Sequence, residues 1–447
     1  MSGTEIRRFS DDQSLIGGRW IVALLQAVSS ALATGLMLPI VILAAYVALL
    51  TNDLYRVALV PILAFGLWNL GALVAGRITR GRVRLLPWAF GAGAVRATAI
   101  GALAYVAYHT NTAEDDRLTA FFLCMGVFGF TSGFTSVPLD ALLQKSFESS
   151  SRAQLFVGRA FWGVLAAVIS GIVVRSVFEP DGPVTQRSFA YLFIAAAGCL
   201  ASAAFFTLLV KEPVRRLSSA RLGANASLLA GLGDRVMQRY LLFRIALAAV
   251  GMLDVFIIVY ALRELNFDRT FLGVYVIGFC VALAIGLPLA RSLCSRRGGR
   301  AVLQASTWMK LISPLLLLTI PYLRDSTDVT EQVAGDRFYL WMLVVCFAAL
   351  GLSLAFQSAG NFQYLSEIAP ATNRAGYFAT ANVALMFATL FPLLGAWIVE
   401  GWDFQRLFGV AAAVALLAVL LSGILVDNRI VASRPSAAAR LGRVSYR

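Results

Sequence analysis

The chain has 447 residues, of which 59% are hydrophobic and only 14% are charged, and its mean hydropathy is +0.77. A soluble domain averages about 25% charged residues, so this much apolar surface must face lipid. The formal charge of +14 suggests nucleic-acid binding, but the basic residues lie in short clusters between apolar runs, which excludes that partner. A single histidine, His109, and five cysteines without metal-ligand spacing exclude most metal and acid–base enzymes, and nothing indicates a cofactor.

Taken in chain order, the apolar runs predict twelve transmembrane helices, because each run is long enough to cross the hydrocarbon core. The first run contains Pro39 and is longer than one crossing requires, so we expect a kink or a tilt. We predict an all-α membrane protein whose spans one to twelve lie near residues 20–44, 54–76, 85–108, 118–142, 156–178, 188–210, 241–262, 270–290, 301–323, 338–360, 377–400 and 405–426.

The basic residues predict the orientation, since Lys and Arg are enriched on the cytoplasmic side of a membrane. Most of the 38 Lys and Arg residues lie on the side of the chain ends, notably in the clusters at 77–84 and 291–300. Acidic residues such as Glu114 and Asp328 lie on the other side, so both termini are expected in the cytoplasm. Short loops and an Ala- and Arg-rich composition favour a bacterial inner membrane. The basic residues expected on the far side are Arg56, Arg117, Arg187, Arg263, Arg269, Arg324, Arg337 and Arg406.

The two halves of the chain look like copies of each other. The sequence Ser-Arg-Ala-Gln-Leu-Phe at 151–156, entering span five, matches Asn-Arg-Ala-Gly-Tyr-Phe at 373–378, entering span eleven. Six plus six spans of the same orientation form a parallel repeat about an axis along the membrane normal. We predict cytoplasmic tails at 1–19 and 427–447, six-helix bundles at 20–210 and 241–426, and a cytoplasmic loop at 211–240 between them.

With these features the chain resembles the major facilitator superfamily over almost its whole length. The resemblance rests on the 6+6 plan, the long central loop, the basic loops after spans two and eight, and the arginines entering spans five and eleven. The family signature Gly-x-x-x-Asp-Arg-x-Gly-Arg-Arg keeps its Gly and Arg elements at 76–84 and 291–300 but lacks the aspartate. The resemblance implies that the two bundles of this fold rock about a central cavity, lined by spans one, four, seven and ten.

Polar residues inside the spans are the candidates for substrate binding or ion coupling. Asp254 in span seven is the first candidate for proton coupling, and a structural ion pair is the alternative. Arg96 in span three and Lys310 in span nine lie near mid-depth, where a structural role competes with anion binding. Arg175 and Arg244 lie near predicted span ends and are expected to extend toward the membrane surface. The amide side chains that complete this set are Gln26, Gln357 and Asn382.

A second group of charged residues lies at the cytoplasmic ends of spans four, five, ten and eleven. We interpret it as a gate or latch whose ion pairs form when the protein faces outward and break when it faces inward. Solvated loop charges are the alternative. The members of this group are Asp140, Arg152, Arg159, Glu367 and Arg374.

Together these observations predict a secondary active transporter of a small organic solute, coupled to protons, and not an enzyme. Buried cations outnumber buried anions, which favours an anionic or zwitterionic solute. The expected partners are that solute, protons and membrane lipid, without nucleic acid, and the protein is expected to be a monomer. The alternatives are a transport-inactive sensor or assembly factor of the same fold, and a lipid-moving facilitator.

Overall fold

The computed structural model describes residues 3–109, 113–147, 149–178, 185–213, 231–325, 332–370 and 374–426. The predicted C-terminal tail and residues 214–230 of the predicted central loop lie outside these ranges. The described residues are almost entirely helical, as expected for a chain that must satisfy its backbone hydrogen bonds within lipid.

The described residues of the first half form eight α-helices, because spans one and two are each interrupted. Helix α1 extends from Gly3 into the membrane, so it also covers most of the segment predicted as a tail. The helices of this half are α1 (Gly3–Leu36), α2 (Ala44–Leu50), α3 (Leu54–Pro61), α4 (Leu67–Ile78), α5 (Leu86–Tyr108), α6 (Glu114–Ser146), α7 (Ser149–Phe178) and α8 (Gln186–Leu208).

The second half repeats the plan with seven helices, and spans seven and eleven are the interrupted ones. The long helix α11 is broken at Gly298, whose φ of 82° and ψ of 177° are not helical. The helices of this half are α9 (Arg235–Ala249), α10 (Phe256–Arg263), α11 (Leu272–Asp325), α12 (Gln332–Ile368), α13 (Arg374–Ala388), α14 (Phe391–Gly401) and α15 (Phe404–Gly423).

Eleven helices in the described residues are long and apolar enough to cross a membrane. One of them, Arg269–Leu323, contains the break at Gly298 and therefore counts as two crossings. The total agrees with the predicted twelve, and each crossing overlaps its predicted place, although span seven begins at Arg235 and span ten continues to Ile368. Both Gly18 and Gly423 then lie on one side of the membrane, which we call the terminal face, and the other side is the distal face.

Span one was expected to kink or tilt, and the structure shows a kink. Helix α1 ends at Leu36, and Leu38 leaves the helical region at ψ 114° before a π-helical turn begins at Pro39. A residue that precedes proline is disfavoured in the α conformation, which explains the position of the break. Span seven breaks without a proline, between Ala249 and Phe256, and a short 3₁₀ turn fills part of the gap.

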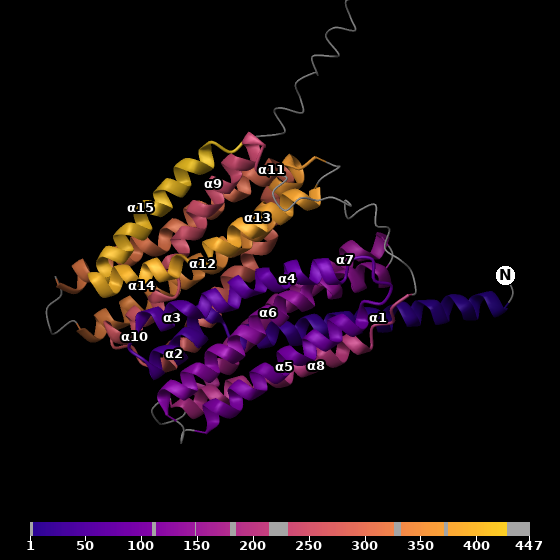
Figure 1. Cartoon of the computed structure of the whole chain (residues 1–447), viewed down its shortest axis with the longest axis horizontal. Coiled ribbons are helices and arrows are strands. Elements are labelled where there is room, and N and C mark those ends of the chain that lie inside the picture. The colour runs from indigo at the N-terminus through magenta and orange to yellow at the C-terminus, as the bar shows by residue number, and fades with distance from the viewer. Residues whose placement is uncertain are drawn as a thin grey trace, which may run out of the picture.

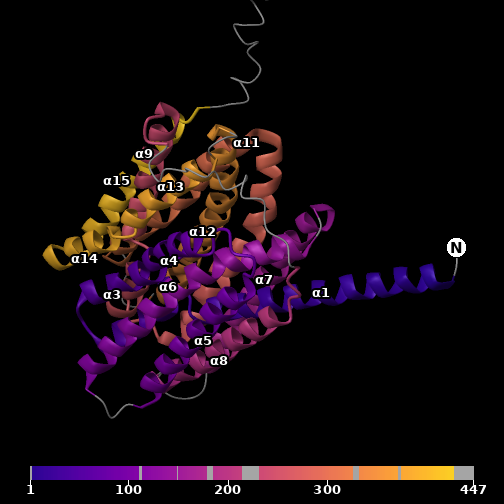
Figure 2. The same ribbon diagram turned by 45° about the vertical axis from the view of Figure 1, so that its right-hand side comes forward.

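The two halves form bundles that lie side by side in Figure 1, the first coloured from indigo to magenta and the second from rose through orange to yellow. Helices α11 and α7 are in contact, and they also lie side by side in Figure 2, which is turned by 45°. Other contacts between the halves include α3 with α14, α2 with α10 and α4 with α13. Packing is close: a Cβ on Gly273 of α11 would lie 2.5 Å from the Cα of Arg175 in α7.

Buried apolar residues are distributed differently on the two faces. Near the distal face a single cluster, the shared core, takes Tyr46 and Phe121 from the first half and Phe256 and Phe347 from the second. Near the terminal face the clusters of each half are separate, for example around Leu143 in the first half and around Tyr240 and Tyr364 in the second. Among the described residues, no buried cluster on the terminal face takes members from both halves. The buried core that joins the bundles therefore lies toward the distal face, while α4 and α13 also touch across the halves.

Candidate functional site

An ion pair lies in the middle of the second half. The Nζ atom of Lys310, in α11, is 2.6 Å from both carboxylate oxygens of Asp254. Asp254 lies in the irregular segment between α9 and α10, and its side chain is 23% exposed while that of Lys310 is 9% exposed. The break in span seven thus carries a carboxylate that contacts span nine. The sequence predicted both residues as candidates, and the structure brings them together.

A chain of hydrogen bonds joins spans seven, nine and ten nearer the terminal face. Arg244 of α9 donates from Nη1 to Oε1 of Gln357 at 3.0 Å. Gln357 donates from Nε2 to Oγ of Ser353 at 3.0 Å, and Ser353 donates to the carbonyl of Ser306 at 2.9 Å. Each step fixes the next, so the amide of Gln357 presents its oxygen to the guanidinium.

The expectation for Arg244 is wrong. Helix α9 begins at Arg235 rather than near residue 241, so Arg244 lies more than two turns inside the helix. Its side chain is buried, at 8% exposure, instead of extending to the membrane surface. Neighbouring Tyr240 is also buried, stacks on Tyr364 with ring centroids 5.4 Å apart, and donates to Asn361 at 3.2 Å. Arg175, by contrast, is exposed.

The first half holds a smaller polar group at similar depth. The Nη2 atom of Arg96 in α5 is 3.4 Å from Oγ of Ser30 in α1, and Nε of Arg96 is buried without a partner. Oε1 of Gln26, one turn before Ser30, and Oγ of Ser132 in α6 are likewise buried without partners. Asn382 is different, since it lies exposed on α13 outside the two networks described here.

Arg159 and Glu367, two of the proposed latch residues, form hydrogen bonds within their own halves. Nη1 of Arg159 donates to the carbonyl of Ala23 at 3.0 Å, and Asp140 of α6 lies close enough to attract this guanidinium electrostatically. Glu367 accepts from the backbone N–H of Gly299 at 3.2 Å and from Gln363 at 2.9 Å. Arg152 and Arg374 lie in the first turns of α7 and α13, and their side chains fall outside the described residues.

Sequence reasoning missed a buried ion pair at the terminal face of the first half. Nζ of Lys145 is 3.0 Å from Oε1 of Glu212, with side chains only 2% and 8% exposed. Glu212 also accepts from the backbone N–H groups of Leu85 and Leu86, at the start of α5. A carboxylate there is favoured by the free N–H groups and the dipole of the helix. The only sequence signal was an acid directly after span six.

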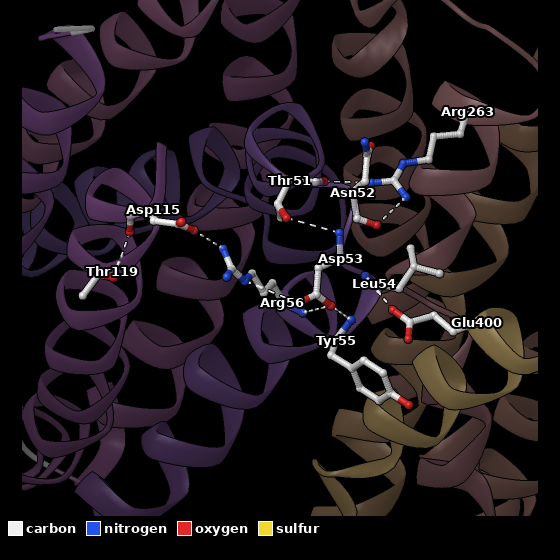
Figure 3. Close-up of polar contacts among 10 residues, drawn as sticks. All are labelled: Thr51, Asn52, Asp53, Leu54, Tyr55, Arg56, Asp115, Thr119, Arg263 and Glu400. Atoms are coloured by element: carbon white, nitrogen blue, oxygen red, sulfur yellow. Dashed lines mark hydrogen bonds and ion pairs between the residues drawn. The ribbon is translucent and has the colours of Figure 1, made fainter. Parts of the chain in front are cut away.

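The distal face carries hydrogen bonds between the halves, drawn in Figure 3. Arg263, at the end of α10, donates to the carbonyls of Thr51 at 2.9 Å and Asn52 at 3.1 Å, between spans one and two. Glu400 of α14 accepts from the backbone N–H of Leu54 at 3.2 Å. Two spans of the second half therefore hold one short loop of the first. The sequence placed Arg263 on this face but gave no sign of its partners, because they are backbone atoms.

Within the described residues, no group of three or more His, Cys, Asp or Glu side chains is placed to hold a metal ion. The arrangement consists instead of buried charges and amides between helices. Such groups are costly in lipid and mark pathways for solutes, ions or protons in transmembrane bundles.

Comparison with known proteins agrees with this arrangement. The family model described as Major Facilitator Superfamily matches residues 240–445, and no curated protein matches the chain. The xylose transporter XylE from E. coli, in an inward open conformation, has a similar structure with a TM-score of 0.68, 15% identity, and coverage of 96% of this chain and 99% of that one. A D-xylose-proton symporter has a TM-score of 0.68 and 13% identity, with coverage of 92% of this chain and 98% of that one. The nucleoside transporter NupG has a TM-score of 0.65 and 14% identity, with coverage of 96% of this chain and 100% of that one.

Proposed function

We propose that this chain, a transporter of the Major Facilitator Superfamily by the sequence of its second half and the fold of the whole, couples solute movement to protons. The proposed cycle is alternating access between the two bundles. The solute is a small organic molecule, anionic or zwitterionic, and the working unit is a monomer in a bacterial inner membrane.

The orientation follows from the basic clusters at 77–84 and 291–300, which lie on the terminal face. Because such clusters stay in the cytoplasm, we infer that the terminal face and both termini are cytoplasmic. The distal face is then the outside.

The observation that carries the transport cycle is the unequal packing of the two faces. The shared core and the contacts of Arg263 and Glu400 join the bundles outside, while the buried clusters inside remain separate. This corresponds to an inward-facing state, and the similarity to the inward open conformation of XylE supports it. The outward-facing state requires the distal contacts to break and the cytoplasmic ends to approach.

The ion pair between Asp254 and Lys310 is the proposed coupling element. A proton on Asp254 removes its negative charge and frees Lys310, so protonation changes how span seven is held against span nine. The carboxylate lies where span seven is already broken, so a local change there needs no intact helix to be disrupted.

The charge balance supports an anionic or zwitterionic solute. Arg96, Arg244 and Lys310 lie within the spans, and Asp254 forms an ion pair with Lys310, whereas Arg96 and Arg244 hydrogen-bond to the neutral side chains of Ser30 and Gln357. A negatively charged group would compensate the excess positive charge, which is expensive to leave unpaired in a low dielectric.

The test is uptake by proteoliposomes with an imposed pH gradient, using Asp254→Asn. We expect this variant to lose the pH dependence of transport while keeping exchange of solute across the membrane. Asp116→Asn, in an exposed acidic turn at the start of α6, is the matched control and should behave as the wild type. Unchanged pH dependence in Asp254→Asn would refute the coupling role. Failure of the wild type to move any solute would favour the transport-inactive sensor, and movement of lipid alone would favour the lipid facilitator.

A further inference from the structure

Within the part of the chain that the structure describes, the guanidinium of Arg244 is a buried charge without a counter-charge. Its partners are neutral side chains: Oε1 of Gln357 accepts one hydrogen bond, and Tyr240 lies within hydrogen-bonding reach. Its Nε atom is buried and has no partner. Among the described residues, no carboxylate lies within ion-pair distance of it. An arginine presents five N–H donors, so this group is far from saturated.

The surroundings of Arg244 are held in place by other contacts. The hydrogen bonds from Gln357 through Ser353 to Ser306 fix the amide, and stacking on Tyr364 fixes the ring of Tyr240. Preorganised donors of this kind are what a binding site needs, because little side-chain entropy is lost when the ligand arrives.

A second buried arginine, Arg117, differs from Arg244 in having a carboxylate nearby, as expected for a structural residue. Arg117 is 6% exposed and, like Arg244, hydrogen-bonds to the side-chain oxygen of a glutamine, Gln186. It also has a carboxylate 3.9 Å away, on Glu114. Arg117 lies at the distal face, whereas Arg244 lies on the terminal side, where no buried core joins the halves.

We propose that Arg244, positioned by Gln357 and accompanied by Tyr240, binds the anionic group of the transported solute, a carboxylate or a phosphate. Planar guanidinium groups bind both of these oxyanions through two parallel N–H donors. The inference rests on the proposed function, since it assigns the substrate class of the same transporter. A neutral solute would leave the charge of Arg244 uncompensated.

Equilibrium binding tests this inference separately from transport. The measurement is the thermal stability of the purified protein in detergent, titrated with lactate, succinate or inorganic phosphate, and with xylose as a neutral probe. We expect at least one anion, and not xylose, to raise the melting temperature of the wild type. The carboxylate and phosphate titrations show which oxyanion the site prefers.

Two substitutions and a matched control assign the effect to Arg244. Arg244→Gln should weaken anion binding on the order of a hundredfold, as expected for the loss of a charged, two-donor contact. Gln357→Glu should also weaken anion binding, because it places a carboxylate against the guanidinium, where it competes with the anion. It should also raise the melting temperature without ligand, which shows that the variant is folded. Gln186→Glu makes the same change beside Arg117 and should leave anion binding unchanged.

The outcomes separate this inference from the transport proposal. If no anion stabilises the wild type, or if Gln357→Glu responds to anions as the wild type does, Arg244 is a structural residue and the inference is wrong. If anions bind with the expected dependence on Arg244 but proteoliposomes transport none of them, the binding site stands and the transport proposal fails.

Discussion

The contacts at the distal face make the equilibrium between inward- and outward-facing states predictable. Arg263→Gln removes a guanidinium that donates to two backbone carbonyls of the loop between spans one and two. Each hydrogen bond contributes a net free energy of about 1 kcal/mol. In the variant, the free energy that favours the distal-closed state should therefore fall by about 2 kcal/mol. This shifts the ratio of distal-open to distal-closed molecules by about 30-fold.

Electron spin resonance can measure that shift as a distance distribution. Spin labels at Tyr105→Cys in α5 and Tyr322→Cys in α11 report on the two bundles from exposed positions near their distal ends, at 65% and 66% exposure. The five native cysteines must first be replaced. We expect Arg263→Gln to increase the population at the longer distance. Glu400→Gln keeps an acceptor for Leu54 and should have a smaller effect.

The control for this experiment is Arg406→Gln. Arg406 lies on the same face but rests on Trp402 of its own half, 5.7 Å from the ring centroid. The substitution should leave the distance distribution unchanged. If Arg263→Gln gives the same distribution as Arg406→Gln, the hydrogen bonds to Thr51 and Asn52 do not hold the distal face closed, and this reasoning is refuted.

Two further predictions concern stability, measured as the melting temperature in detergent. Lys145→Met leaves the carboxylate of Glu212 buried without its cation and should destabilise the protein by about 3–5 kcal/mol, whereas the pair Lys145→Met with Glu212→Leu should recover part of that loss. Gly298→Ala places a Cβ on a residue with φ of 82° and ψ of 177°, and should cost about 1–3 kcal/mol. Its control, Gly409→Ala in α15, lies in open space and should be neutral or slightly stabilising.

The span pattern could be predicted from the sequence because it depends on backbone chemistry alone. A crossing helix needs about 20 apolar residues, and the pattern of these runs does not depend on how the helices pack. The irregularity in span one could also be expected from the sequence, since Pro39 restricts the residue before it. The break in span seven could not be predicted, because it contains no proline and Gly251 is the one residue there that favours an irregular backbone.

The candidate site was predicted as residues but not as contacts. Asp254 and Lys310 stood out because charges within spans are rare, yet nothing in the sequence gives the rotation of span seven relative to span nine. Arg244 was misjudged because hydropathy placed the start of span seven near residue 241, and the polar first turns of α9 from Arg235 were left out. Contacts to backbone atoms, such as those of Arg263 and Glu212, have no sequence signature at all.

The two proposed sites share one structural element, and this suggests how proton and solute are coupled. Ser306 and Lys310 are four residues apart on α11, so they lie on the same face, about 6 Å apart along the axis. Ser306 accepts the hydrogen bond that orients Ser353 and Gln357 toward Arg244, and Lys310 holds Asp254. Span nine therefore contacts the break in span seven directly, through Asp254, and is linked to Arg244 of the same span through span ten. Protonation of Asp254 alters the first of these links, and an anion bound to Arg244 alters the second. Each event therefore changes how span seven is held, and this in turn affects the other event.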